Sequence, residues 1–185
     1  MHSYKSIPQL DSHRLKYRPL TLSDASRVQL LAGHPKIAET TATIPHPYLD
    51  GLAEQWISGH EKACSEGRGL DWGIELKSSS ILIGNISCFI DSKNKKVEIG
   101  YWVGHQYWSQ GYMTEALLTI RDFLFQKTSI NKITCRHIEC NPASGKVMLK
   151  AGLKLEGQLK QEFFRNEKFQ DMIVYGLTRD DYQKI

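Results

Sequence analysis

The sequence predicts a mixed α/β (α+β) domain with a central, mostly antiparallel sheet of about seven strands and about four helices. Residues 97–103 mix β-branched and aromatic side chains between two glycines, which is typical of a strand with a buried face. From Met113 onward, apolar residues recur with the spacing of an amphipathic helix. Residues 70–103 contain two breaks made of turn-forming residues, which predicts a three-strand antiparallel meander.

Length and composition indicate one domain of ordinary size over residues 1–185. Hydrophobic residues make up 41% and charged residues 24% of the chain, which is normal for a globular protein in water. No apolar run has membrane-spanning length and the first residues lack a signal-peptide core, so we expect a cytoplasmic protein without a membrane partner. The net charge of +4 suits an anionic ligand but does not by itself indicate direct nucleic-acid binding.

The four cysteines show no Cys-x-x-Cys spacing and lie inside apolar segments, which predicts reduced thiols that pack in the interior. They are Cys64, Cys88, Cys135 and Cys140. Strand alternation puts Cys135 and His137 on one face and Cys140 on the other. Because this spacing supplies too few ligands for a tetrahedral zinc site, we expect no metal.

The first part of the chain predicts one strand and two helices. Residues 14–18 form a short alternating segment that ends before a proline, as an edge strand does. A first helix runs to about Leu31, and a second, capped by Asp50, ends at Gly67. Residues 40–47 contain two prolines and are predicted to be a loop, which either shapes substrate access or simply connects the helices.

The second part predicts a strand-helix-strand unit. The meander strands span about 70–76, 81–90 and 96–103, a helix runs to about Lys127, and a strand covers 132–140. Such a connection normally makes the two strands parallel, with ligands beyond their carboxyl ends. A further helix, capped by Asn141 and ended by Gly152, precedes two strands at 153–164 and 169–177.

The junction Trp108-Ser-Gln-Gly-Tyr lies at those carboxyl ends, immediately before the long helix. Gly111 lets the backbone approach a ligand closely, and a helix N-terminus favours anions. The junction is therefore a candidate phosphate cradle, and the alternative is a plain tight turn. It has neither a Gly-x-Gly-x-x-Gly pattern nor a Gly-Lys-Ser/Thr ending, which argues against a Rossmann site and a P-loop. A nucleotide hydrolase would also need the lysine and acidic metal ligands that are missing here.

Five segments together match a known pattern in the expected order. They are Leu15-Lys-Tyr-Arg-Pro-Leu, Glu98-Ile-Gly-Tyr-Trp-Val, Trp108-Ser-Gln-Gly-Tyr-Met-Thr-Glu-Ala, Asn141-Pro-Ala-Ser with Lys150-Ala-Gly-Leu, and Asp171-Met-Ile-Val-Tyr-Gly-Leu. On these segments the chain resembles a GNAT-superfamily N-acetyltransferase of the RimJ/RimL-type branch. Two positions depart from the superfamily: Trp108 stands where Gln or Arg is general, and Met113 where most relatives have Gly or Ala.

The resemblance implies a GNAT-like fold whose two parallel strands splay apart after Val103 and Cys140. It implies acetyl-CoA as cosubstrate, no metal, and direct attack by an amine in a ternary complex. Asn141 would cap its helix and bond the pantetheine arm. The backbone positions that the resemblance assigns to the cofactor are Trp102 and Val103 for the pantetheine, and Gln110, Gly111, Tyr112, Met113 and Thr114 for the pyrophosphate.

Two residues are candidates for proton transfer. Glu98 would draw the proton from the amine, directly or through water, because partly apolar surroundings raise the pKa of a carboxylate toward a value that suits a base near neutral pH. Glu162 is the reserve candidate for this role. Ser144 would protonate the departing thiolate. The structural alternatives are a solvated strand residue for Glu98 and a first-turn helix residue for Ser144. Glu115 is expected to complement the helix dipole, and His105 either touches the ligand or faces solvent.

The resulting hypothesis is an acetyl-CoA-dependent N-acetyltransferase acting on a primary amine, with a protein N-terminal α-amine or a small molecule as the acceptor. The alternative is a non-catalytic acyl-CoA-binding or ribosome-associated module of the same fold. The joint presence of Glu98, Asn141 and Ser144 favours the enzyme. The acceptor, and whether the protein is a monomer or a homodimer, are left open by the sequence.

Overall fold

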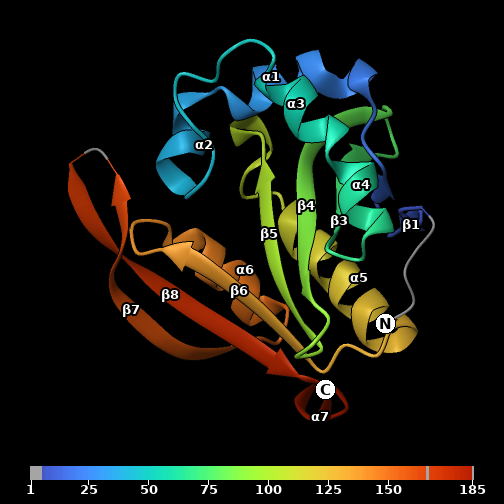
Figure 1. The fold of residues 1–185 in the computed structure, drawn as a ribbon, viewed down its shortest axis with the longest axis vertical. Coiled ribbons are helices and arrows are strands. Elements are labelled where there is room, and N and C mark those ends of the chain that lie inside the picture. The colour runs from blue at the N-terminus through green and yellow to red at the C-terminus, as the bar shows by residue number, and fades with distance from the viewer. Residues whose placement is uncertain (1–5, 166, 185) are drawn as a thin grey trace.

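An eight-stranded sheet in the order β1-β2-β3-β4-β5-β6-β8-β7 runs through the protein (Figure 1). The computed structural model describes residues 6–165 and 167–184. Neighbouring strands are antiparallel except β5 and β6, which are parallel. The strands are β1 (Leu10–Asp11), β2 (Leu15–Arg18), β3 (Gly69–Leu76), β4 (Ile81–Asp91), β5 (Lys96–Val103), β6 (Lys132–Ile138), β7 (Lys154–Arg165) and β8 (Lys168–Thr178).

Helices cover both faces of this sheet (Figure 1). The early helices gather over one face, whereas the long α5 and the shorter α6 lie on the other. The helices are α1 (Ala25–Ala32), α2 (Pro35–Thr40), α3 (Leu52–Ser58), α4 (His60–Ser65), α5 (Tyr112–Lys127), α6 (Pro142–Lys150) and α7 (Arg179–Tyr182). Two short 3-10 helices, η1 (Leu22–Asp24) and η2 (His105–Tyr107), precede α1 and α5.

Two apolar clusters, one on each face, hold the layers together. Successive residues of β4 show the division, because Leu82 packs in the cluster of α1 and α3 while Ile83 packs in the larger cluster of α5 and α6. On β5, Trp102 belongs to the first cluster and Val103 to the second. This alternation follows from the two-residue period of a strand buried on both sides.

The sheet opens between β5 and β6. Their register runs from Lys96 opposite Lys132 to Glu98 opposite Thr134 and stops there. Beyond that point β5 stays paired with β4 as far as Val103, so the two parallel strands diverge toward their carboxyl ends (Figure 1). The predicted splay of these strands is therefore confirmed, but it begins beyond Glu98 and Thr134, earlier along both strands than the expected Val103 and Cys140.

The predicted element order is largely confirmed, with corrections in the first 66 residues. The first expected helix, to about Leu31, is confirmed as α1, but the short α2 that follows it was not expected, and the second expected helix is divided at Gly59. The assignment of Asp50 as a helix cap was wrong: Gly51, with φ of 85°, is the N-cap of α3, and Asp50 accepts a hydrogen bond from Gln29. The short β1 was not expected.

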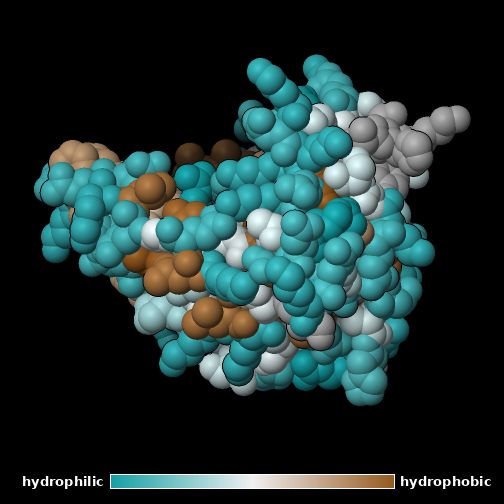
Figure 2. All heavy atoms as spheres, turned by 90° about the horizontal axis from the view of Figure 1, so that it is seen from below, coloured by the Kyte–Doolittle hydropathy of each residue, from teal (hydrophilic) through white to brown (hydrophobic). Residues whose placement is uncertain are grey.

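The surface seen from below is mostly hydrophilic, with apolar groups gathered on the side where β7, β8 and α6 lie (Figure 2). Exposed apolar side chains of α6 and β7 include Leu149, Leu155 and Leu159. Within residues 6–165 and 167–184, no helix combines the length and the apolar character needed to span a membrane.

Candidate active site

The predicted phosphate cradle is a tight turn that leads directly into α5. Ser109 and Gly111 both have left-handed backbone, with φ of 59° and 78°. Gly111 is the N-cap, and because glycine has no side chain, the first N–H groups of α5 have no side-chain cap. Met113 is only 7% exposed and packs in the core, so its side chain does not occupy the approach to these groups. The turn therefore has the form of an anion site at a helix start.

Arg14 holds this turn from the side of β2, a contact that the sequence did not reveal. Its Nη1 donates to the Gln110 carbonyl at 3.0 Å, its Nε donates to Glu115 at 2.7 Å, and its guanidinium lies 4.4 Å from the Tyr112 ring centroid. Some 96 to 101 residues separate these partners along the chain, so no local pattern could indicate the contact. A positive charge thus lies next to the predicted pyrophosphate position.

Glu115 belongs to the same arrangement. Its carboxylate accepts hydrogen bonds of 2.7 Å from the Ser12 hydroxyl and from the Arg14 backbone N–H, besides the Arg14 side chain. Burial disfavours the charged form, but these hydrogen bonds outweigh it and lower the pKa of Glu115 below its ordinary 4.5. Its place in the first turn also fits the predicted dipole role, and its main contacts tie α5 to the β1–β2 turn.

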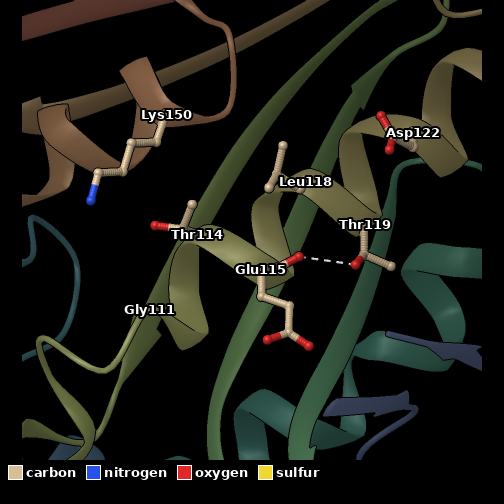
Figure 3. A pocket seen from close by; sticks show the side chains of 7 residues that line it. All are labelled: Gly111, Thr114, Glu115, Leu118, Thr119, Asp122 and Lys150. Atoms are coloured by element: carbon tan, nitrogen blue, oxygen red, sulfur yellow. Dashed lines mark hydrogen bonds between the residues drawn. The ribbon is translucent and has the colours of Figure 1, made fainter. Parts of the chain in front are cut away.

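An open pocket of about 400 Å³ begins at the cradle and follows α5 (Figure 3). Its lining residues are Gly111, Thr114, Glu115, Leu118, Thr119, Asp122 and Lys150. All but Lys150 come from the start and outer surface of α5, and Lys150 is the last residue of α6. The cradle is therefore the end of a groove that lies between two helices.

Asn141 occupies the end of β6 on the other side of the splay. Its Oδ1 accepts a hydrogen bond of 3.2 Å from the Ser144 N–H, and Pro142 follows as the first helical residue, so the predicted cap is confirmed. Its Nδ2 donates to the Thr40 carbonyl at 2.9 Å. Asn141 thus joins the start of α6 to the end of α2.

Ser144 lies in the first turn of α6 and faces β5. Its Oγ is 2.8 Å from the Tyr101 hydroxyl, which also donates to the Ser144 carbonyl at 3.3 Å. Burial raises the pKa of Tyr101 well above its ordinary 10, so this phenol keeps its proton at neutral pH. Ser144 therefore has a protonated hydroxyl as its neighbour, which sequence spacing alone could not predict.

Glu98 lies where the splay begins, on the opposite face of β5 from Tyr101 and Ser144. It is opposite Thr134 in the last register pair of β5 with β6. Its carboxylate accepts a hydrogen bond of 2.7 Å from Arg136 Nε, and its side chain is 34% exposed. It is therefore half-buried and paired with a cation rather than set in the apolar surroundings that we expected.

The reserve candidate, Glu162, lies on β7 away from this point. Its side chain is exposed, and it falls in a stretch where the register with β8 shifts between Leu159 and Phe163. The structure thus brings Glu98 to the start of the splay and leaves Glu162 on the outer arm.

A segment after the middle of α2, residues 38–44, crosses to the β7–β8 arm; we call it the strap. The Arg165 guanidinium donates three hydrogen bonds of 2.7 Å to the strap, to the carbonyls of Ala38, Thr41 and Ile44. Together with the bond from Asn141 to Thr40, these contacts fix the strap beside the carboxyl end of β6. The sequence indicated a loop here but not what holds it.

The remaining predicted positions lie around the same opening. Trp102 and Val103 end β5 with buried side chains, and Trp108 Nε1 donates to the Val103 carbonyl at 2.8 Å. His105 stacks on His34 with ring centroids 3.6 Å apart. The imidazole of His105 is therefore packed against another ring rather than simply facing solvent.

Three of the cysteines are buried as predicted, namely Cys64, Cys88 and Cys135. The prediction was wrong for Cys140, which is exposed at the end of β6 with its Sγ 3.6 Å from the Glu39 carbonyl. Burial raises the pKa of Cys88 and of Cys135, so both stay thiols at neutral pH. Within the described part of the chain, His, Cys, Asp and Glu side chains form no group of three or more that could hold a metal.

Comparison with known families and proteins agrees with this geometry. The model of the acetyltransferase (GNAT) domain matches residues 14–154, which include the cradle, the splay and Ser144. The uncharacterized N-acetyltransferase YoaA of Bacillus subtilis is 26% identical over 174 residues, covering 94% of this chain and 98% of that protein. The ribosomal-protein-serine acetyltransferase of Escherichia coli is 36% identical over 100 residues, covering 54% and 56%.

Solved structures share the whole architecture. RimL, a ribosomal L7/L12 α-N-protein acetyltransferase in complex with coenzyme A, superposes with a TM-score of 0.85 at 21% identity, covering 95% of this chain and 98% of that one. The microcin C7 self-immunity acetyltransferase MccE, in complex with acetyl-CoA and AMP, gives 0.82 at 22% identity, covering 90% and 93%. At these identities the likeness concerns the fold.

Proposed function

Because the chain belongs to the acetyltransferase (GNAT) domain family, we propose that it transfers the acetyl group of acetyl-CoA to a primary amine. The observation that carries the proposal is the diverging pair β5 and β6 beside the uncapped start of α5. An extended pantetheine arm can lie between strands that no longer pair, and a pyrophosphate can lie on the helix N-terminus. One ligand of this shape fits both features.

The residues at the turn suit this ligand. Gln110, Gly111, Tyr112, Met113 and Thr114 supply the backbone around the start of α5, with Met113 turned into the core. Arg14 contributes a nearby positive charge that favours two phosphates. The acetyl thioester would then lie in the splay, between the Tyr101–Ser144 pair on one face and Glu98 on the other.

The chemistry requires a neutral amine, its attack on the thioester carbonyl, and a proton for the sulfur that leaves. We assign removal of the amine proton to the Glu98 carboxylate, acting through water because the side chain is paired with Arg136. The amine nitrogen then forms the new bond to the carbonyl carbon, the carbon–sulfur bond breaks, and the electron pair stays on sulfur.

The proton for sulfur comes from Ser144 Oγ in this assignment. Tyr101, whose hydroxyl lies 2.8 Å away, can return a proton to Ser144 and so keep it a donor. Since the amine attacks the thioester directly, no covalent acetyl-enzyme is needed, and the buried Cys64, Cys88 and Cys135 have no part in the reaction.

For the acceptor, we propose a protein N-terminal α-amine. The support comes from relatives: the ribosomal-protein-serine acetyltransferase and the [ribosomal protein uS5]-alanine N-acetyltransferase of Escherichia coli both match this chain, the second at 23% identity over 100 residues. Structures of spermidine N-acetyltransferases also superpose, with TM-scores of 0.80 and 0.79, so a small polyamine is the competing acceptor.

The test is a panel of peptide N-termini and polyamines, each incubated with purified protein and acetyl-CoA, with free thiol release as the readout. Gly111→Val is the matched control, because a branched residue at φ of 78° is strained and adds side-chain atoms where pyrophosphate must approach. We expect turnover with the unchanged protein and loss of acetyl-CoA binding in the folded variant. Binding of acetyl-CoA without thiol release for any acceptor would favour a non-catalytic module.

A further inference from the structure

The first turn of α6 brings polar side chains from three strands together. Ser144 Oγ lies 2.8 Å from the Tyr101 hydroxyl of β5, and we call these two groups the hydroxyl pair. The next residue is Gly145, where a Cβ would lie 2.8 Å from His137 Nε2 of β6 and 3.0 Å from the Tyr175 hydroxyl of β8. Because glycine has no side chain, these two polar atoms approach the same point beneath the helix.

His137 lies across the open gap from Tyr101. The parallel register pairs Glu98 with Thr134, and three residues further along the two strands are Tyr101 and His137. Tyr101 packs against the larger apolar cluster, and Cys135, two residues before His137, belongs to it, so both rings are on the α6 side of the sheet. A thioester between the diverging strands would therefore have the hydroxyl pair on one side and His137 on the other.

The His137 ring is held so that one of its nitrogens is free. Nδ1 donates to the Ile138 carbonyl at 2.8 Å, and the ring stacks on Tyr175 with centroids 5.8 Å apart. Within the described part of the chain, Nε2 has no hydrogen-bond partner, and the fully buried nitrogens without a partner both belong to His60. His137 Nε2 is thus open enough to exchange a proton with water, and histidine is the side-chain type that does so near neutral pH.

The hydroxyl pair needs a proton from another group. When Ser144 gives its proton to sulfur and Tyr101 replaces it, Tyr101 is left as a phenolate. Burial raises the pKa of Tyr101 well above 10, whereas an ordinary thiol has a pKa of about 8.5, so the phenolate is a stronger base than the thiolate. The charge of Tyr175 adds to this rise, which places Tyr175 beside Tyr101. Cys135 also acts on Tyr101, but burial raises the pKa of Cys135 itself, so this thiol holds its proton.

We propose that His137 and Tyr175 relay a proton to the hydroxyl pair, so that the imidazolium supplies the proton that reaches the coenzyme sulfur. His137 Nε2 gives its proton to the Tyr175 oxygen, and the Tyr175 proton moves to Tyr101. The Tyr101 proton moves to Ser144, whose own proton goes to the thiolate. The imidazolium becomes imidazole, the thiolate becomes a thiol, and the three hydroxyls end as they began.

This inference rests on the proposed function, because it concerns the proton that the leaving thiolate receives. His137 and Tyr175 act through the hydroxyl pair, so they are positioning residues rather than catalytic ones. Their role differs from simple packing in one measurable way: a relay moves several protons together, whereas packing moves none.

The experiment measures kcat, KM and the dependence of kcat on the deuterium content of the solvent, with acetyl-CoA and the acceptor that turns over best. Tyr175→Phe keeps the stacked ring and removes the hydroxyl, and His137→Gln removes the imidazole. We expect each change to lower kcat roughly a hundredfold and to leave the KM for acetyl-CoA unchanged. A plot of kcat against deuterium fraction should be curved for the unchanged protein and straight for Tyr175→Phe.

Tyr182→Phe is the matched control. Tyr182 also stacks on an aromatic ring and has a hydrogen-bonded hydroxyl, but it lies in α7, away from the splay. This variant should match the unchanged protein in kcat and in the curvature of the deuterium plot. If His137→Gln does not fold, Tyr175→Phe decides alone.

Two results would overturn the relay and leave the proposed function in place. Equal turnover of Tyr175→Phe and the unchanged protein means that the Tyr175 hydroxyl passes no proton. A lower kcat with a plot that keeps its curvature means that Tyr175 only supports the position of α6. If the unchanged protein releases no thiol with any acceptor, the proposed function fails and the relay fails with it.

Discussion

Gly145 provides the sharpest test of how α6 is seated on the sheet. Replacing a helix-interior glycine with alanine normally stabilises a protein by about 0.5–1 kcal/mol. Here, however, a Cβ at position 145 would lie 2.8 Å from His137 Nε2 and 3.0 Å from the Tyr175 hydroxyl. His137 cannot easily yield, because it is 8% exposed, donates from Nδ1 to the Ile138 carbonyl at 2.8 Å and stacks on Tyr175.

We therefore expect Gly145→Ala to be destabilising. Overpacking of this kind costs about 1–3 kcal/mol, and subtracting the helix-propensity gain leaves a net loss of up to about 2.5 kcal/mol. Relief of the contact requires α6 to move outward, which draws Ser144 from Tyr101 and lowers turnover if that pair donates the proton. Urea unfolding gives the free energy of unfolding, and thiol release gives the rate.

Two further variants identify the cause. Gly157→Ala is the control, since a Cβ there meets nothing within 4 Å, and it should change stability by less than about 0.5 kcal/mol. In a His137→Ala background, Gly145→Ala should become neutral or stabilising, and the double-mutant cycle measures the coupling. If the Gly145→Ala protein is at least as stable as the parent, α6 does not pack so closely on β6 that an added Cβ is excluded.

Three other expectations concern pH and positioning. Burial lowers the pKa of His60 below its ordinary 6.5, so the unfolded chain binds a proton at a higher pH than the folded protein does. The free energy of unfolding should therefore decrease as the pH falls below about 6.5. In His60→Phe, the melting temperature should fall less over the same pH range. In Arg165→Met the strap loses three hydrogen bonds, so the KM for the acceptor should rise about tenfold while the affinity for acetyl-CoA stays unchanged. Lys168→Met, which removes an exposed cation from the same arm, is the control. Glu98→Gln should lower turnover by roughly a hundredfold near neutral pH and recover at alkaline pH, whereas Ser144→Ala should not recover; parallel pH–rate profiles would contradict the division of roles.

Local signals in the sequence predicted much of the fold. Strand alternation, turn residues and the Asn141-Pro cap were sufficient for β3 to α6, because these elements depend on neighbours along the chain. The early helices were less well predicted because one apolar stripe continues across Gly59, where the helix ends and a new one begins. Asp50 is a residue type that favours helix N-caps, but the N-cap of α3 is Gly51, which has a left-handed backbone.

What the sequence could not predict are the contacts between distant segments. Arg14 meets Gln110, and Tyr101 meets Ser144, only because the sheet and helices bring them together. The pairing of Glu98 with Arg136 depends on the parallel register of β5 and β6, which no single-sequence pattern fixes. The sequence therefore supplied candidate residues for the chemistry, whereas their partners and their distribution over the two faces of the sheet came only from the structure.

The short seam between β5 and β6 also has a mechanical consequence. Three register pairs, from Lys96 with Lys132 to Glu98 with Thr134, join one group of five strands to a group of three. The register of β5 with β6 stops at Glu98, so deuterium should quickly replace the gap-facing amide protons of the last residues of β5 until a bound ligand bridges the gap. Pulled from its two ends, the molecule should part along this seam before either group of strands unravels.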